Sequence, residues 1–115
     1  LFPWGNEDPV RGQVNFGNHV GKPTKVGSYP ESRSPFGLED MAGNVWEWVA
    51  DWYRVDYYVN SPAANPTGPQ TGSLRGYRGG SWLNGITALR TNERGRLEPT
   101  RLGPDIGFRC CSDAF

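Results

Sequence analysis

Residues 36–48 read FGLEDMAGNVWEW, the stretch in which turn-forming, acidic and aromatic residues are combined most densely. The segment from Asp40 to Gly43 predicts a tight turn, because glycine adopts backbone conformations that other residues avoid. Residues Val45 to Ala50 are mostly β-branched or aromatic, which favours an extended strand. We therefore expect a turn followed directly by a strand at the centre of the fold.

The composition around this stretch predicts a fold with much ordered loop. Among 115 residues there are 16 Gly and 10 Pro, and aromatic residues make up 13% with five Trp. Glycine and proline interrupt regular structure, while aromatic rings supply large apolar surfaces that can pin loops together. The aromatic content also excludes an intrinsically disordered chain. The length corresponds to one domain or a piece of one.

Outside the central stretch the pattern predicts only short elements. We expect strands at 26–29, 78–82 and 106–111 and a short helix over 86–94. Residues 1–35, 54–75 and 96–104 are expected to be loop, because proline and glycine recur throughout them.

The charge balance limits the classes of partner. Twelve basic residues face 12 acidic ones, so nothing electrostatic favours nucleic acid or an anionic membrane surface. The apolar runs are too short to insert into a bilayer. The chain begins at Leu1 instead of Met, which we interpret as a processed, cleaved or partial chain.

Asn44 and Glu47 suggest a metal site next to the turn. Both offer side-chain oxygens, and a glycine turn ahead of them exposes backbone carbonyls; calcium takes six to eight oxygens from such mixed sources. An alternative is open: Asn44 serves as a turn residue and Glu47 pairs with an arginine. The single histidine, His19, excludes a site of several histidines within these residues.

Four segments resemble, in order, landmarks of the formylglycine-generating-enzyme family, also called sulfatase-modifying factors. They are residues 2–6, 36–48, 78–82 and 107–110. The resemblance implies an irregular α+β, C-type-lectin-like fold with short strands, few helices and much ordered loop. It also implies that residues 1–115 are the C-terminal portion of a single domain, whose N-terminal portion would be its first partner.

The resemblance carries expectations about metals. It implies a structural calcium at Gly43, Asn44, Val45 and Glu47. Family oxidases use copper held by two cysteines, and these positions fall at Asn84 and Leu89, neither of which is a thiol. Copper(I) prefers thiolate ligands, so copper is not expected and formylglycine-generating oxidase activity is disfavoured.

The two cysteines of the sequence are adjacent, at 110 and 111. A disulfide between chain neighbours is strained, so we expect two thiols or a partner outside this chain. In the family the position of Cys110 pairs with an upstream cysteine. Calcium and such a disulfide weakly favour an exported location, where calcium is plentiful and thiols oxidise.

Trp48 and Ser81 match family positions that line the substrate groove. The predicted ligand groove comprises Trp48, Ser81, Asn84, Arg94 and Arg96. Arg78, Arg90 and Arg109 are instead expected to tie loops to backbone carbonyls.

We expect a non-catalytic, calcium-stabilised module that binds a protein, peptide or glycan, with residues 83–105 as its variable face. The alternative is part of an oxidoreductase of a sister branch, a sulfoxide synthase or siderophore-precursor oxidase, whose redox metal ligands lie outside this chain. A third hypothesis is an appendage of a signalling or surface protein, such as a kinase-linked relative.

Overall fold

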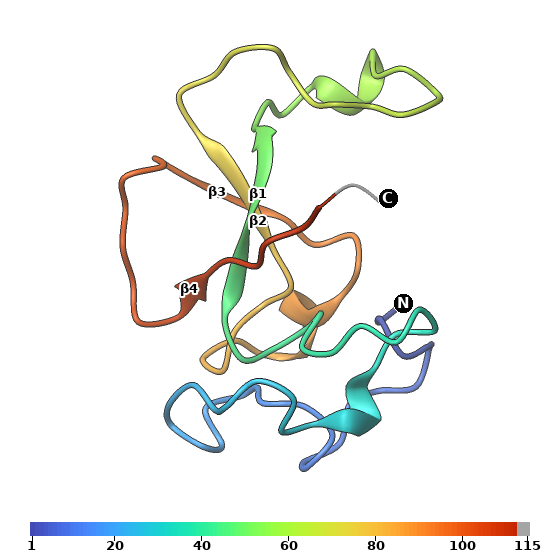
Figure 1. Ribbon diagram of the computed structural model, residues 1–115, viewed down its shortest axis with the longest axis vertical. Coiled ribbons are helices and arrows are strands. Elements are labelled where there is room, and N and C mark those ends of the chain that lie inside the picture. Colours follow the sequence, from blue (N-terminus) through green and yellow to red (C-terminus); the bar gives the residue numbers. More distant parts are fainter. Residues whose placement is uncertain (113–115) are drawn as a thin grey trace.

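The computed structural model describes residues 1–112, and these residues form one small mixed sheet surrounded by loops (Figure 1). The strands are β1 (Trp46–Trp52), β2 (Arg75–Arg78), β3 (Gly95–Leu97) and β4 (Ile106–Gly107). Their order is β3-β2-β1-β4, with β1 and β4 parallel and the other pairs antiparallel. Helical structure in this part of the chain is limited to the 3-10 turns η1 (Pro30–Ser32), η2 (Tyr57–Val59) and η3 (Ile86–Leu89). The expectation of short strands, few helices and much ordered loop is confirmed.

The loops lie at the two ends of the central strand pair. Residues 1–45 fold at one end of β1 and β2, and the loop of residues 53–74 lies at the opposite end (Figure 1). Backbone hydrogen bonds between loops replace strand ladders in the first group: Asn44 N–H donates to Asn15 O over 2.8 Å, and Gly17 N–H donates to Asn84 O over 2.8 Å. Loops joined in this way satisfy their backbone groups without regular structure.

The predicted central strand is confirmed as β1, but three predicted elements need correction. Residues 26–29 form a turn and not a strand, because Gly27 has φ +75° and the Ser28 N–H bonds back to Lys25 O. The strand predicted over 78–82 ends at Arg78, since Gly79 and Gly80 have φ +96° and +73°. The last predicted strand, over 106–111, is limited to the two residues of β4.

The predicted helix over 86–94 is also much shorter than expected. Only η3 forms, because Arg90 is extended at φ −66° and ψ 143°. Strand β3 then starts at Gly95, partly within the segment expected to be loop, and pairs with β2 through Arg75 opposite Leu97. The chain therefore turns back towards the sheet where a continued helix was predicted.

The buried core is small and lies at the loop-rich end of the sheet. It consists of Phe2, Val14, Ala42 and Leu89. Trp4, Phe16 and Ile86 pack against it while remaining partly exposed. All five tryptophans are half-buried, so they brace the surface of the sheet and loops without filling the core. No helix in the described part of the chain is both long and apolar enough to span a lipid bilayer.

Candidate functional site

The turn before β1 is fixed by two consecutive residues in the left-handed region, Gly43 at φ +76° and Asn44 at φ +62°. The Gly43 N–H donates to Gly79 O over 2.7 Å, and Trp82 N–H donates to Asn44 O over 2.8 Å. These bonds join the turn to the segment that follows β2. The sequence places a glycine where this conformation carries the least steric cost.

The Asn44 side chain is used inside the fold. Its Oδ1 accepts hydrogen bonds from Thr24 N–H at 2.8 Å and Thr24 Oγ1 at 3.3 Å, and its Nδ2 donates to Thr24 O at 3.2 Å. Asn15 Nδ2 lies 3.4 Å from the same Oδ1. The amide thus ties residues 15–24 to the start of β1, which is the turn-residue role that the sequence left open.

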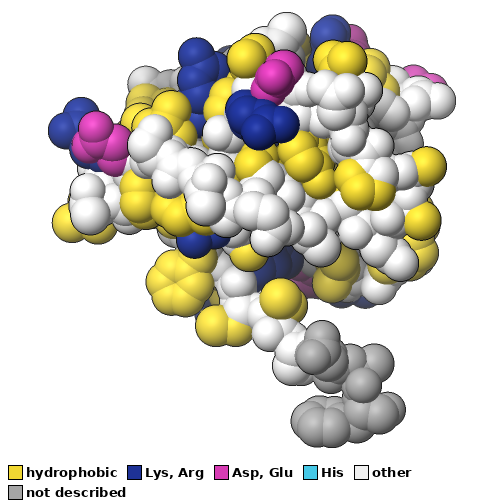
Figure 2. Space-filling model, turned by 90° about the horizontal axis from the view of Figure 1, so that it is seen from above, with side chains coloured by type: hydrophobic (Ala, Val, Ile, Leu, Met, Phe, Trp, Pro, Cys, Tyr) yellow, Lys and Arg dark blue, Asp and Glu magenta, His cyan; other side chains and the backbone are white. Residues whose placement is uncertain are grey.

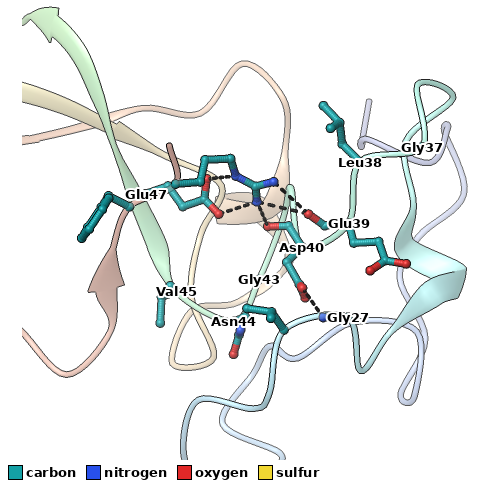
Figure 3. Close-up of a pocket in the computed structure, with 12 residues that line it drawn as sticks. Gly27, Gly37, Leu38, Glu39, Asp40, Gly43, Asn44, Val45 and Glu47 are labelled. Atoms are coloured by element: carbon teal, nitrogen blue, oxygen red, sulfur yellow. Dashed lines mark hydrogen bonds and ion pairs between the residues drawn. The ribbon is translucent and has the colours of Figure 1, made fainter. Parts of the chain in front are cut away.

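Glu47 forms a bidentate ion pair with Arg109. The distances are 2.6 Å from Arg109 Nε to Oε2 and 2.5 Å from Nη2 to Oε1. The guanidinium also donates to the backbone oxygens of Glu39 and Asp40, at 3.0–3.1 Å, so it lies between β1 and the loop before the turn (Figure 3). Hydrogen bonding to Glu47 raises the pKa of Arg109, whereas burial lowers it to a lesser extent. Arg109 is therefore a framework arginine, as expected, and so is Arg78, which donates to Thr91 O and Glu93 O.

A cavity of about 400 Å³ lies beside this pair and collects several oxygen donors. Asp40, Gly43, Val45 and Glu47 line it, and Asp40 Oδ2 accepts a 2.7 Å hydrogen bond from Gly27 N–H (Figure 3). Asp40 was not among the predicted site residues. Its signal was present, because Asp40 is a carboxylate at the first residue of the predicted turn, seven residues before Glu47.

These donors can be tested against the calcium that the family resemblance implies. Two carboxylates and the backbone of Gly43 and Val45 fit the oxygen ligands that calcium takes. Among residues 1–112, no three His, Cys, Asp or Glu side chains gather in a metal-binding arrangement, so a calcium ion here depends on backbone oxygens. The Asn44 side-chain oxygen already accepts bonds from Thr24, and Arg109 competes for Glu47.

The structure separates the predicted groove residues into groups. Ser81 is fully buried, and its Oγ lies 2.7 Å from Asn84 Oδ1 and 3.1 Å from Asp105 Oδ2. Trp48 packs on Tyr77 with ring centroids 6.0 Å apart. Ser81 and Asn84 therefore form an internal turn, with Ser81 below the surface.

Arg94 and Arg96 belong to a separate group at the start of β3. Both guanidinium groups lie over the ring of Tyr53, and Arg94 also lies over Tyr58. Arg94 is half-buried and Arg96 is exposed, and the ligand contact predicted for these two arginines stays a prediction.

The two positions matched to the family's copper cysteines have structural roles. Leu89 is 1% exposed within the core, and the Asn84 Oδ1 accepts hydrogen bonds from Ser81. Cys110 and Cys111 are both exposed free thiols.

Surface charge shows no extended area of one sign on the face in Figure 2. Lys and Arg side chains are set singly among hydrophobic ones there, with acidic side chains between some of them. The described residues on this face therefore present no broad basic surface of the kind that nucleic acid needs.

Comparison with known proteins gives a match along almost the whole chain. The domain family described as "Sulfatase-modifying factor enzyme 1-like domain" matches residues 1–114. The formylglycine-generating enzyme of Streptomyces coelicolor is 43% identical over 81 residues, covering 68% of this chain and 26% of that enzyme. Serine/threonine-protein kinase pkn1 of Chlamydia caviae is 41% identical over 111 residues, covering 95% of this chain and 17% of the kinase.

A solved structure agrees with these sequence matches. PvdO from Pseudomonas aeruginosa superposes with a TM-score of 0.73 at 31% identity, covering 94% of this chain and 42% of PvdO. The predicted fold is confirmed by this likeness together with the small mixed sheet. The chain spans less than half the length of each of these proteins.

Proposed function

Because this chain belongs to the sulfatase-modifying factor, or formylglycine-generating-enzyme, family, we propose that it is part of a non-catalytic, calcium-stabilised domain that binds a protein, peptide or glycan. The observation that carries the non-catalytic part is the identity and packing of residues 84 and 89. Leu89 supplies no ligand atom and is buried in the core, while the amide of Asn84 caps Ser81. An oxidase of this family needs a thiolate at each of these two positions, and this chain has a thiol at neither.

The calcium part of the proposal rests on the cavity beside β1. Asp40 and Glu47 would supply carboxylate oxygens, and Gly43 and Val45 would supply backbone oxygens. Calcium would supply structural cross-linking at this point and no chemistry. The ion would hold the turn against the first residues of β1, so the loops at this end of the sheet would be ordered by the metal as well as by Asn44.

The relatives supply a second candidate. The Streptomyces coelicolor protein is by name an enzyme. The match covers 26% of its length, so the other 74% (100% − 26%) lies outside the match. An oxidoreductase of a sister branch could therefore draw its redox metal ligands from outside these residues. In that case residues 1–112 would supply scaffold and substrate contacts.

The experiment that separates the two candidates is elemental analysis of the purified full-length protein after dialysis, by inductively coupled plasma mass spectrometry. We expect about one calcium per chain, as one site of this donor set would bind, and no copper or iron. Copper or iron at one per chain would overturn the non-catalytic proposal and favour the oxidoreductase.

A further inference from the structure

A second group of side chains gathers where β1 ends and β3 begins. We call it the arginine–tyrosine site, and it comprises Tyr53, Tyr58, Arg78, Arg94 and Arg96. Tyr53 follows the end of β1, Tyr58 is part of η2, and Arg94 immediately precedes β3. β3 pairs antiparallel with β2, with Arg96 opposite Gly76. This pairing brings Arg94 and Arg96 close to Tyr53 and Tyr58, which follow β1.

Arg94 lies over two tyrosine rings at once. Its Cζ is 4.5 Å from the centroid of Tyr53 and 4.3 Å from that of Tyr58. Arg96 lies 5.0 Å from the Tyr53 centroid, with its Nη1 3.3 Å from the tyrosine hydroxyl. Stacking on the rings holds the flat faces of the guanidinium groups and leaves the N–H groups at their edges for other partners.

Within residues 1–112, no ion pair neutralises the positive charge of this site. Among residues 1–112 the arginines paired with carboxylates are Arg33, Arg54 and Arg109. Arg78 uses its guanidinium on two backbone oxygens and on the Tyr58 hydroxyl, at 2.8 Å. Within the described residues, the N–H groups of half-buried Arg94 have no hydrogen-bond acceptor. A half-buried cation with unused donors favours an anionic partner.

A cavity of about 240 Å³ opens beside Arg94. Its walls include Tyr53, Tyr57, Tyr58 and Tyr77, together with Arg78 and one carboxylate, Asp51. The volume lies below the usual range for drug-sized ligands, about 300–1,000 Å³. The cavity therefore suits a single ring or one side chain more than an extended chain of sugars.

From this geometry we propose that the arginine–tyrosine site binds an aromatic ring that carries one oxyanion group, a sulfate, phosphate or carboxylate, with the ring against the tyrosines and the oxyanion on Arg94 and Arg96. The forked donors of arginine match all three oxyanions, and the aromatic walls match the ring. This inference rests on the proposed binding function and names the chemistry of its ligand.

The test is calorimetric titration of the full-length protein with 4-nitrophenyl sulfate, 4-nitrophenyl phosphate and 4-nitrobenzoate, and with neutral 4-nitroanisole. We expect at least one anion to bind more than about tenfold more tightly than 4-nitroanisole, the factor that one charge-assisted hydrogen bond provides. The ranking of the three anions identifies the oxyanion. Failure of all three to bind, or equal binding of 4-nitroanisole, would overturn the proposal.

Single substitutions test whether the anion binds at the arginine–tyrosine site. Arg94→Gln and Arg96→Gln are each expected to weaken the favoured anion by about tenfold, and Arg94→Lys is expected to do so as well, because lysine keeps the charge but loses the fork. Arg11→Gln removes the same charge from an exposed loop residue outside the site and should leave binding unchanged. The Arg96 side chain is exposed, so its variant keeps the test valid if Arg94→Gln does not fold.

The outcome is independent of the metal experiment. If the anions bind equally to wild type and to both glutamine variants, this site assignment fails while the calcium content remains as measured. If copper or iron is found instead, the non-catalytic proposal fails whatever the anions do.

Discussion

Replacement of Gly43 by alanine is expected to lower the free energy of unfolding by about 2–5 kcal/mol, the sum of backbone strain and overpacking. Gly43 has φ +76°, where an L-residue other than glycine is strained. An added Cβ would lie 2.5 Å from Asn15 O and 2.5 Å from Val14 Cγ2. Since a small domain is stable by only about 5–15 kcal/mol, this loss would remove a large part of its stability.

The neighbours of Gly43 cannot move away without further loss. The Asn15 oxygen accepts the Asn44 N–H, and Val14 belongs to the buried core. A shift that relieves the clash would break a buried hydrogen bond or open the core. The measurement is urea denaturation followed by tryptophan fluorescence, which gives the free energy of unfolding by linear extrapolation.

Gly37→Ala is the matched control. Gly37 has φ +78°, nearly the same as Gly43, but no atom lies within 4 Å of its added Cβ. It should lose only the backbone strain, about 1–2 kcal/mol. Equal losses in the two variants would show that the contact with Asn15 and Val14 is not the cause.

Calcium is expected to stabilise the folded protein, because a ligand that binds only the folded state shifts the unfolding equilibrium. At one hundred times the dissociation constant the gain is about 2.7 kcal/mol. Asp40→Asn should remove most of this gain while keeping the hydrogen bond from Gly27 N–H, since an amide oxygen also accepts. Thermal melting in a chelator and at rising free calcium measures both effects.

Arg109→Gln gives the sharpest form of this test. In the chelator the variant should be less stable by about 1–2 kcal/mol, because the partly exposed pair with Glu47 and the bonds to two backbone oxygens are lost. In calcium it should gain more than wild type, since Glu47 no longer has a competing cation. The two changes are opposite in sign, so general damage to the fold cannot produce both.

Glu39→Gln is the control for this series. Glu39 lines the same cavity but pairs with Arg33, so the calcium gain should remain near that of wild type. A calcium gain of zero in wild type, or an equal gain in wild type and Asp40→Asn, would refute the metal assignment.

The turn and the central strand were predictable because their causes are local. Glycine at position 43 and the β-branched and aromatic residues after it favour a turn and a strand whatever surrounds them. Even so, the sequence did not show which oxygens face the cavity. The Asn44 side-chain oxygen bonds to Thr24, and Asp40 adds a carboxylate to the cavity wall, because residues 22–27 come back over the turn.

The elements that sequence analysis missed depend on distant partners. Residues Gly95–Leu97 show no alternation of polar and apolar side chains, and β3 exists because β2 offers a free edge. Ser81 was expected in a groove, but Asp105, 24 residues later, comes to lie beside its hydroxyl. That Arg94 and Arg96 face a ligand stays a prediction. Glu93 lies three residues before Arg96 and Glu98 four residues after Arg94, but no ion pair forms with either glutamate within residues 1–112, where this segment is a strand and not a helix.

The sheet order has a consequence for the protein at high concentration. The two edge strands, β3 and β4, have three and two residues, whereas the longest strand, β1, pairs with β2 on one side and, through Trp46 and Glu47, with β4 on the other. An exposed edge offers unpaired backbone groups to the edge of another molecule, and very short edges offer few of them. The first residues of β1, a strand with three tryptophans in seven residues, are thus kept from the sheet edge by β4. Folding of the loops that position β4 therefore also protects this part of β1 from intermolecular β-pairing.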